Sequence, residues 1–383
     1  MDIQELKNIQ ADLDTFCEGF GDCFARSGSR KYLNIYVTGQ LSDLERKSVE
    51  PIALEAGVPV RTLQEFLDIY KWDENRMRGR LIETLQMEHP DDNAVGVIDG
   101  TTYVKKGNKT AGVQRQYCGA RGKTENCVAS VHLGFASGSF HALVDSDLYL
   151  PELSWMADPK KREEAGIPEG LCFRTKWKIA VDLVTRSLAC GLRLKWITAD
   201  EEFGRSGEFR HAMGLQDLYY MLEVPASLTG RFGNPDTEKP GMKVHKISDL
   251  WNRGGPRWVV YNVKETQKGP IVWKARETYF YLTSHPARKK ERLIIARNVL
   301  TGEIKYFLSN APASISVAKL LTVAFSRWHV EKLFQEAKGE IGLDHFEVRK
   351  YQSIIRHLTL SNLSLYFLSH HCGKLKKKIR GGR

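Results

Sequence analysis

Apolar and polar residues follow two different periods along the chain. In residues 1–90, and again in residues 313–372, the pattern is typical of helices. Residues 91–225 instead alternate short apolar runs, such as NAVGVI and LKWITAD, with the helix-like run KWKIAVDLVTRSLACG. Strands that alternate with helices predict the α/β class, here with a mixed sheet flanked by helices.

Residues 226–312 interrupt this alternation. They contain consecutive runs rich in Val, Tyr and Trp, punctuated by Gly and Pro, and we predict a separate β-rich insertion subdomain. Residues 1–90 are predicted to form an N-terminal helical domain. Residues 373–383 are predicted to form a basic tail that is disordered.

The run AFSRWHVEKLFQEAKGEI, residues 324–341, predicts one continuous amphipathic helix. On a helical wheel Arg327, Glu331 and Lys338 share one narrow face. That face borders a predicted buried stripe, which consists of Val330, Leu333, Phe334, Ala337 and Ile341. A carboxylate at the border can face a cleft while its helix stays anchored in the core. The alternative is a surface ion pair between Arg327 and Glu331.

The N-terminal region contains a pattern of helix, turn and short second helix. The motif SDLE at Ser42 predicts the start of the first helix, Gly57 ends it, and Thr62 is the expected N-cap of the second. This is the pattern of a helix-turn-helix, in which Arg61, Thr62 and Gln64 would lie at the end that enters a DNA groove. An ordinary helical hairpin is the alternative.

The charge of the chain favours a polyanionic partner. Its 57 Lys and Arg against 46 Asp and Glu give a net charge of +11, and nucleic acid is the commonest polyanion in cells. Basic residues gather in and after the loop that follows the first predicted strand, where we expect them to contact DNA. They are Lys105, Lys106, Lys109, Arg115, Arg121 and Lys123.

Cysteine usage and hydropathy predict the compartment. The seven cysteines are scattered and contain no CxxC pair, as is typical of reduced thiols. No signal peptide and no apolar run of about 20 residues is visible. We therefore expect a cytoplasmic protein without a membrane partner.

Three acids occupy positions from which they can converge. Asp99 follows the first predicted strand, Asp200 follows a later strand, and Glu331 lies on the predicted helix. A few carboxylates together with a phosphate are what Mg²⁺ prefers, and a pair of such ions can activate a water or a 3′-hydroxyl. Arg327 and Lys338 would then hold the phosphate. Asp99 as a simple turn residue of an Asp-Gly hairpin is the alternative.

The chain resembles a known family. Arg327, Glu331 and Lys338 match the R-E-K part of the Y-R-E-K signature of bacterial insertion-sequence transposases. Over roughly residues 30–370 the chain is similar to the DDE-superfamily endonucleases, in an ordered series of segments: VIDGTTYVKKG, VQRQYCGARGKTENC, LYLPELSW, ITADEEFG and RWHVEKLFQEAKGEIGLDHFEVR.

This resemblance implies a ribonuclease-H-like catalytic domain made of residues 91–225 and 313–372, with the β insertion before the last acid. It also implies Mg²⁺-dependent DNA strand cleavage and transfer, with Mn²⁺ as a substitute ion. Asp99, Asp200 and Glu331 would be the metal ligands. Arg327 and Lys338 would be the signature's basic residues.

The chain departs from the family pattern in two places. The signature's Tyr falls on Ala324, and Gly100 stands where many relatives carry a second Asp. Asp344, His345 and Arg349 match the family's GLDHFE block and its surroundings, and for them loop structure and DNA contact are equally open.

Three functions remain as hypotheses. The first is a transposase that binds insertion-sequence ends in double-stranded DNA as a homodimer, in the cytoplasm at the nucleoid. The second is a catalytically silent DNA-binding protein derived from a transposase. The third is a structure-selective nuclease of the same fold. The complete set of three acids favours an enzyme over the silent protein.

Overall fold

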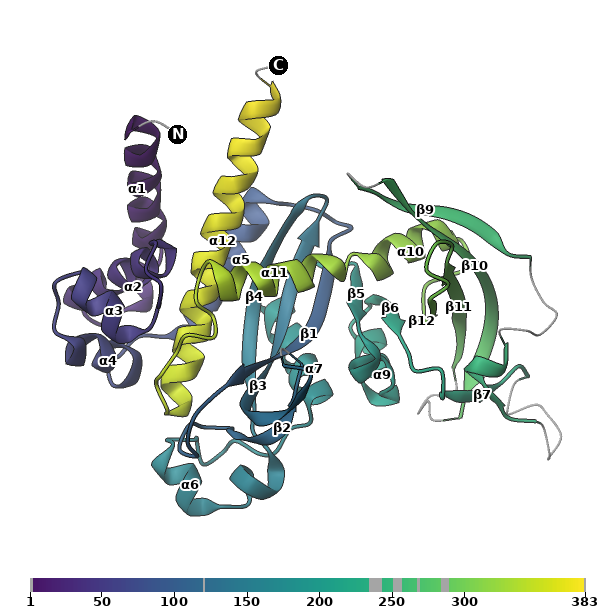
Figure 1. The fold of residues 1–383 in the computed structure, drawn as a ribbon, viewed down its shortest axis with the longest axis horizontal. Helices are drawn as coiled ribbons and strands as arrows, with labels where there is room; N and C mark the ends of the chain where they lie inside the picture. Colours follow the sequence, from purple (N-terminus) through teal and green to yellow (C-terminus); the bar gives the residue numbers. More distant parts are fainter. Residues whose placement is uncertain are drawn as a thin grey trace. The chain divides into compact units, whose positions relative to one another are not determined.

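The computed structural model describes residues 3–119, 121–233, 243–250, 257–266, 269–283 and 289–381. The chain folds into two compact units. Unit 1 comprises Met1–Pro90, Gly100–Leu192 and Glu331–Arg383, and unit 2 comprises Asp91–Asp99 and Arg193–Val330. The chain therefore crosses between the units four times. Two crossings lie before Asp91 and before Arg193, one lies inside strand β1 (Val95–Val104) and one inside helix α11 (Trp328–Gly339) (Figure 1).

The regular elements of the N-terminal region are helices, as the sequence pattern predicts. They are α1 (Ile3–Glu18), α2 (Lys31–Leu41), α3 (Val49–Glu55), α4 (Val60–Asp68) and α5 (Glu74–Glu88), with short 3-10 turns at Gly21–Cys23 and Ser27–Ser29. Their apolar faces are buried, with Leu33, Phe66 and Leu81 all at most 1% exposed. Residues 1–90 belong to the same compact unit as the strands β2, β3 and β4.

Two of these helices begin elsewhere than the sequence motifs suggested. Ser42 ends α2, where its hydroxyl donates to the carbonyl of Gly39 at 2.8 Å, and α3 begins only at Val49, after Ser48. The second helix, α4, begins at Val60 after Pro59 and not after Thr62. Proline suits a helix start because its φ is fixed and the N–H that it lacks would have no helical partner there.

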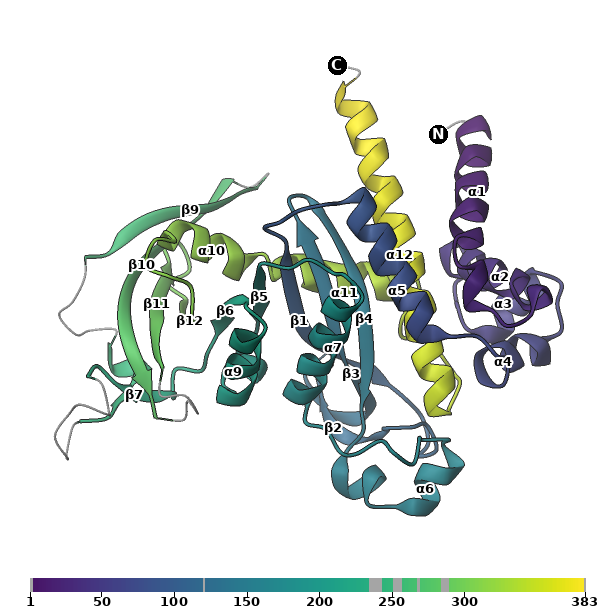
Figure 2. The ribbon, with the colours of Figure 1, turned by 180° about the vertical axis from the view of Figure 1, so that it is seen from behind.

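Unit 1 contains an antiparallel sheet covered by helices. Strand β3 (Lys123–Ser137) pairs with β2 (Gln114–Cys118) and with β4 (Phe140–Tyr149). Helix α7 (Lys176–Ala189) packs on β3 and β4, and α12 (Tyr351–Gly381) packs along β4 and against α2, α4 and α5 (Figures 1 and 2). A π-helical turn (Glu152–Met156) and α6 (Pro159–Glu164) connect β4 to α7.

Alternate side chains of β4 contact two helices, α7 and α12. Asp145 points toward α7, where its carboxylate accepts from Arg186 at 2.5 Å. The next residue, Ser146, hydrogen-bonds Asn362 of α12 at 3.1 Å. Since neighbouring side chains of a strand point to opposite faces, this buried polar strand joins α7 and α12 to the sheet.

Unit 2 contains a mixed sheet. Its parallel part is the start of β1 with β5 (Trp196–Ala199) and β6 (Tyr219–Glu223). The antiparallel part continues from β6 through β12 (Ile304–Ser309), β11 (Lys290–Asn298) and β10 (Gly269–Leu282). Strands β7 (Thr229–Arg231) and β9 (Val259–Thr266) pair with β10, and β8 (His245–Lys246) pairs with β7.

Helices cover this sheet too. They are α8 (Glu201–Gly204), α9 (Gly207–Leu215) and α10 (Val317–Phe325), with a 3-10 turn at Ile247–Leu250. Phe325 of α10 packs on Trp273 and Phe307, with ring centroids 4.8 and 5.9 Å apart. The neighbours of Phe307 in β12, Tyr306 and Leu308, point instead into an apolar core together with Phe280 and Leu293. The α/β class with a mixed sheet and flanking helices, predicted from the sequence, is confirmed.

The β-rich stretch 226–312 is joined directly to the parallel strands. Strand β12 pairs with β6, with Leu308 opposite Leu222. The described strands of this stretch therefore extend the sheet of unit 2, whereas the sequence suggested a separate subdomain. Its domain boundaries stay a prediction.

The prediction of a single helix over residues 324–341 is wrong. Helix α10 ends at Phe325, α11 begins at Trp328, and Ser326 and Arg327 form a turn between them. The hydroxyl of Ser326 donates to the carbonyl of Val323 at 2.6 Å, a local bond that competes with continuation of the helix. The predicted apolar stripe is nevertheless buried, since Val330, Leu333, Phe334, Ala337 and Ile341 are at most 8% exposed.

Two further expectations from the sequence concern the C-terminal tail and membrane-spanning helices. The described part of the predicted basic tail, up to Gly381, is helical and continues α12, whereas the sequence pattern predicted disorder there. Within the described ranges, no helix combines the length and the apolar character that crossing a bilayer requires.

Candidate active site

Three acids line up on adjacent parallel strands of unit 2. Ile98 of β1 is paired with Ala199 of β5, and Ala199 is paired with Leu222 of β6. The next residue along each strand is an acid, and these acids are Asp99, Asp200 and Glu223. Residues in register on neighbouring parallel strands lie side by side, so the backbone itself brings these three positions into a row, although β1 continues past Asp99 to Val104. Asp99 and Asp200 are the two acids that the sequence pattern predicted in unit 2.

Asp200 is both a helix cap and a half-buried carboxylate. It follows β5 directly, and its Oδ1 accepts a hydrogen bond from the backbone N–H of Glu202 at 2.9 Å, which caps the short helix α8. Burial raises the pKa of Asp200, and the nearby guanidinium of Arg327 opposes that rise. The charged form of Asp200 therefore depends on a neighbouring cation.

Arg327 lies among the acids of unit 2. Its side chain comes from the turn between α10 and α11 and is 17% exposed. One guanidinium nitrogen is 3.6 Å from Oδ2 of Asp99, and another is 3.8 Å from Oε2 of Glu223. Lys305 of β12 also contacts Glu223, at 2.6 Å from Oε1. Two cations thus balance the row of carboxylates.

The donor set fits a hard divalent cation that is shared with a substrate. Asp99 and Asp200 supply the one or two carboxylates with which Mg²⁺ is usually bound, and phosphate oxygens and water supply the rest. Among the described residues, no group of three His, Cys, Asp or Glu side chains is gathered closely enough to hold a metal ion by itself. A third protein ligand, or the DNA phosphate, has to complete such a site.

Glu331 and Lys338 belong to the part of α11 that lies in unit 1. Glu331 is in the first turn of α11, and its side chain is exposed. Lys338 is in the last turn, where its ammonium group donates to the Thr101 hydroxyl at 2.7 Å and to the Thr102 carbonyl at 3.3 Å. Burial lowers the pKa of Lys338. In this structure Lys338 therefore holds the second half of β1.

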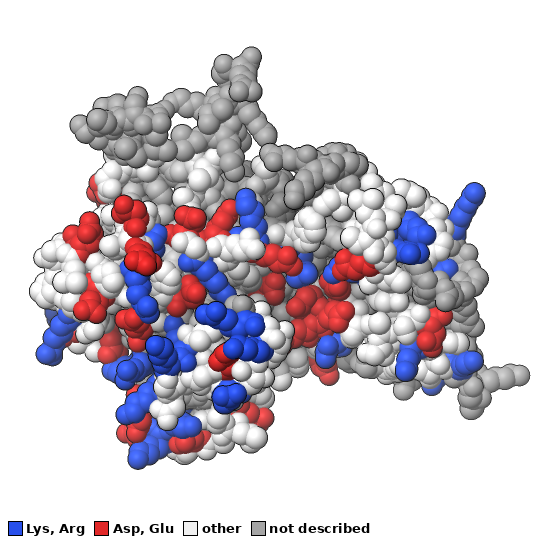
Figure 3. Space-filling view, viewed as in Figure 1, with Lys and Arg blue, Asp and Glu red and all other residues white. Residues whose placement is uncertain are grey.

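The predicted DNA-binding residues of unit 1 differ in exposure. Lys105 is committed to the protein, because its ammonium group donates to the carbonyl oxygens of Asp344 at 3.1 Å and Phe346 at 2.5 Å. Burial lowers the pKa of Lys105 to about 8. The other predicted members have exposed side chains, and they are Lys106, Lys109, Arg115, Arg121 and Lys123. In the face shown in Figure 3, Lys and Arg side chains gather over the part of unit 1 that holds β2, β3 and α6.

Helices α3 and α4 form the expected helical pair, joined by residues 56–59, in which Gly57 adopts a φ of 64°. Arg61 and Gln64 of α4 are exposed, and Thr62 is half-buried. Arg61 pairs with Glu65 at 2.9 Å on the surface of the helix. The surface of α4 is thus open to a partner at Arg61 and Gln64.

The GLDHFE block has loop-anchoring contacts. Nδ1 of His345 accepts the backbone N–H of Lys47 at 3.0 Å, and the carbonyl of Arg349 accepts from the N–H of Ala111 at 2.9 Å. Together with the bonds from Lys105, these contacts fix the loop between α11 and α12. For His345 and for the backbone of Asp344 and Arg349, loop structure is therefore what the contacts support.

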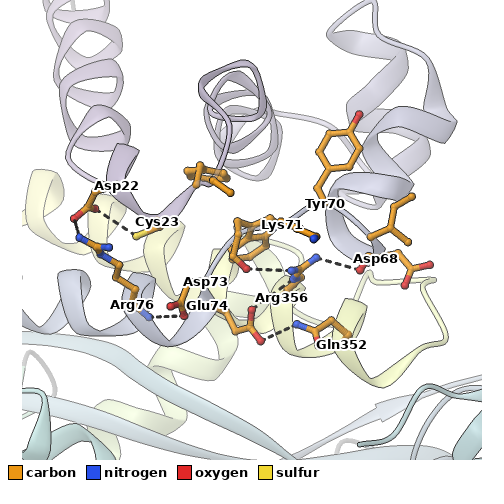
Figure 4. A pocket seen from close by; sticks show the side chains of 14 residues that line it. Asp22, Cys23, Asp68, Tyr70, Lys71, Asp73, Glu74, Arg76, Gln352 and Arg356 are labelled. Carbon is orange, nitrogen blue, oxygen red and sulfur yellow. Dashed lines mark hydrogen bonds and ion pairs between the residues drawn. The ribbon is translucent and has the colours of Figure 1, made fainter.

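A pocket of about 670 Å³ in unit 1 lies between the α4–α5 connection and α12, and none of the predicted site residues lines it. Several of its polar side chains are paired with one another (Figure 4): Arg76 donates to Asp22 at 2.6 Å, and Arg356 contacts Glu74 at 3.6 Å. Arg356 also donates to the carbonyl of Trp72 at 3.1 Å. These contacts tie α12 to the N-terminal helices.

Carboxylates that meet at the edge of a mixed sheet, flanked by helices and cations, are typical of enzymes that cut phosphodiesters with divalent ions. The family described as DDE superfamily endonuclease matches residues 19–264, so the chain belongs to this family. The matched region includes Asp99, Asp200 and Glu223. The resemblance stated from the sequence is thereby confirmed.

A curated relative points the same way. The chain is 29% identical over 214 residues to the "Probable transposase for insertion sequence element IS701" of Microchaete diplosiphon. This match covers 55% of the chain and 53% of the relative, so the chain spans about half the length of the curated relative that it matches.

Glu223 is the acid of this row that the sequence pattern missed. The signal was present, because Glu223 ends the strand-like run LYYMLE in the same way that Asp200 follows LKWITA. Only the pairing of β5 with β6 distinguishes it from the other acids of the chain.

Proposed function

We propose that the protein is a DNA transposase that binds the ends of an insertion sequence and carries out metal-dependent strand cleavage and strand transfer. The observation that carries the proposal is the register of β1 and β5, which places Asp99 and Asp200 side by side. Membership of the DDE endonuclease family and the similarity to a probable transposase support it. The parallel strands of a mixed sheet with flanking helices also support a ribonuclease-H-like catalytic fold.

In this proposal Asp99, Asp200 and Glu331 hold Mg²⁺, or Mn²⁺ in its place. When bound, such ions polarise the phosphodiester and lower the pKa of the attacking water or 3′-hydroxyl. The half-buried Asp200 has a raised pKa, so it takes up a cation with a gain in electrostatic stability. Arg327 contributes a guanidinium to the phosphate in a bidentate manner, and Lys338 keeps β1 in place beside it.

DNA would be held by exposed basic residues. Lys106, Lys109, Arg115, Arg121 and Lys123 would contact backbone phosphates, while Arg61 and Gln64 of α4 would enter a groove. We propose a homodimer on double-stranded DNA, because two ends have to be joined in one event. Such a protein works in the cytoplasm, at the nucleoid.

A catalytically silent DNA-binding protein is the second candidate. The ion pair between Arg327 and Asp99 favours it, since a guanidinium at 3.6 Å neutralises a predicted metal ligand. The two candidates differ in what happens when metal and DNA are added together.

The test is cleavage of a duplex that carries the ends of the element, in the presence of Mg²⁺ or Mn²⁺. Asp99→Asn, Asp200→Asn and Glu331→Gln should each lower the cleavage rate by about a hundredfold or more, because each removes a proposed ligand, and should leave duplex binding intact. Glu169→Gln, in an exposed loop, is the matched control. Cleavage that survives in all three variants contradicts the proposed ligands, and wild-type protein that binds but never cuts favours the silent alternative. Cleavage without strand transfer points to a nuclease.

A further inference from the structure

Glu223 has no role in the proposed chemistry, although it ends β6 in the same row as Asp99 and Asp200. Its side chain is 13% exposed, as is that of Asp99. A carboxylate so little exposed has to be stabilised by cations or by hydrogen bonds. The contacts of Glu223 show which cations these are.

The two oxygens of Glu223 face different cations. Oε1 is 2.6 Å from the ammonium group of Lys305, a distance typical of a charge-assisted hydrogen bond. Oε2 is 3.8 Å from a guanidinium nitrogen of Arg327. Lys305 thus fixes the carboxylate and leaves its second oxygen toward Arg327.

Arg327 is consequently shared between two carboxylates. Its other nitrogen is 3.6 Å from Asp99, a proposed metal ligand. A guanidinium that pairs with Asp99 competes with any cation for the same carboxylate. Glu223 offers that guanidinium a second carboxylate, on β6, which is separated from β1 by β5.

We propose that Glu223 is a positioning residue that acts through Arg327: it draws the guanidinium away from Asp99 and so leaves Asp99 available to a divalent cation. This inference rests on the proposed function, because it assumes that Asp99 binds metal. It assigns Glu223 no contact with the metal itself. Glu223 acts instead on Arg327, which competes with the metal ion for the Asp99 carboxylate.

The chain offers a matched control. Glu303 also contacts Lys305, at 3.6 Å, but its side chain is 53% exposed. Glu223→Gln and Glu303→Gln remove the same charge beside the same lysine. Of the two, Glu223 is the acid that also forms an ion pair with Arg327.

The experiment measures the binding of Mn²⁺ to the full chain by calorimetry, in the absence of DNA. Glu223→Gln should weaken Mn²⁺ binding by about two- to fivefold, as expected for a partly exposed ion pair, and Glu303→Gln by less than about 1.5-fold. Arg327→Ala should strengthen binding, because the competitor is gone. In the Arg327→Ala background, Glu223→Gln should have no further effect. Glu223→Asp, which keeps the charge, should restore binding to within about twofold of the wild type.

The outcomes separate the two levels of the argument. If the wild type binds no Mn²⁺, or binds it equally well as Asp99→Asn, Asp99 is not a metal ligand in the absence of DNA and the role of Glu223 fails, whereas the proposed function is decided by the cleavage assay. If Asp99→Asn abolishes binding but Glu223→Gln matches Glu303→Gln, the role of Glu223 is overturned. An effect of Glu223→Gln that persists without Arg327 also overturns it. In cleavage assays, the metal concentration for half-maximal rate should rise in Glu223→Gln while the rate at saturating metal stays close to that of the wild type.

Discussion

Single buried charges in unit 2 are held by specific partners. Arg210 of α9 and Glu291 of β11 are completely buried and lie 3.3 Å apart. Tyr220 of β6 donates its hydroxyl to the same carboxylate, and Arg210 donates to the carbonyl of Gly204. Burial beside Glu291 raises the pKa of Tyr220, so the hydroxyl stays a donor. This group of side chains links a helix to two strands in the interior.

Removing one member of this pair should be costly. Glu291→Gln takes the carboxylate from a buried guanidinium and should lower the free energy of unfolding by about 3–5 kcal/mol. The double change Arg210→Met with Glu291→Leu should cost less than the sum of the two single changes, because no unpaired charge remains. Urea unfolding measures both. Glu303→Gln, at the surface, is the control, and strictly additive single and double variants would argue against a coupled pair.

At the scale of elements, β3 places a histidine where strands and a helix of unit 1 meet. The ring nitrogens of His132 hydrogen-bond Tyr103 of β1 at 3.1 Å and Ser146 of β4 at 2.7 Å. Its ring also packs edge-on against Phe334 of α11, with centroids 5.1 Å apart. Burial lowers the pKa of His132 to about 3, with a further contribution from the charge of Lys338. His132 is therefore neutral in the fold.

This histidine makes stability depend on pH. The unfolded chain binds a proton at His132 near pH 6.5 while the folded chain does not, so stability is lost as pH falls from 6.5 toward 3. The loss should reach about 2 kcal/mol at pH 5. His132→Gln should make this slope shallower between pH 7 and pH 5 by the share of one histidine, because the pKa of the buried His357 is also lowered to about 3 and its contribution remains. Urea titrations at several pH values give the comparison, and an unchanged slope in His132→Gln would refute it.

The sequence predicts the elements better than their interruptions and partners. The runs before Asp99 and Asp200 indicate two strands, and the pairing of β1 with β5 makes the acids neighbours, but β1 continues past Asp99 to Val104. The apolar period continues across Ser326 and Arg327, so nothing periodic marks the turn between α10 and α11. Lys105 looks like the basic residues around it, because its burial depends on Phe346, 241 positions later. Contacts between distant segments decide both cases, and one-dimensional patterns do not record them.

At the scale of the whole molecule, the net charge of +11 is divided between residues that are free to meet DNA and residues that hold the fold. Exposed lysines and arginines lie in the loop after β1 and on the β2–β3 hairpin. Buried or bonded ones, such as Lys105 and Lys338, stabilise loops and strands of unit 1. Net charge therefore overstates the number of phosphate contacts.

Salt titrations of DNA binding should separate the two groups. Each of Lys106→Ala and Arg121→Ala should make the slope of log affinity against log salt shallower by about one, because each removes one phosphate contact. Lys105→Met should leave the slope close to that of the wild type and lower the thermal stability of the protein, since its ammonium group holds the loop at Phe346. Fluorescence anisotropy with a labelled duplex gives the slopes. A slope change in Lys105→Met equal to that of Lys106→Ala would return Lys105 to the DNA-binding surface.

The last of the four crossings of the chain between the units, after Val330, has a consequence for synthesis on the ribosome. Unit 2 is complete once Val330 has emerged, but unit 1 still lacks α12, the helix that packs along β4 and against α2, α4 and α5. Domains generally fold as their segments leave the ribosome. One face of the strands β2–β4 therefore stays uncovered while unit 2 forms. Unit 1, which contains the first residues of the chain, is the last to be completed.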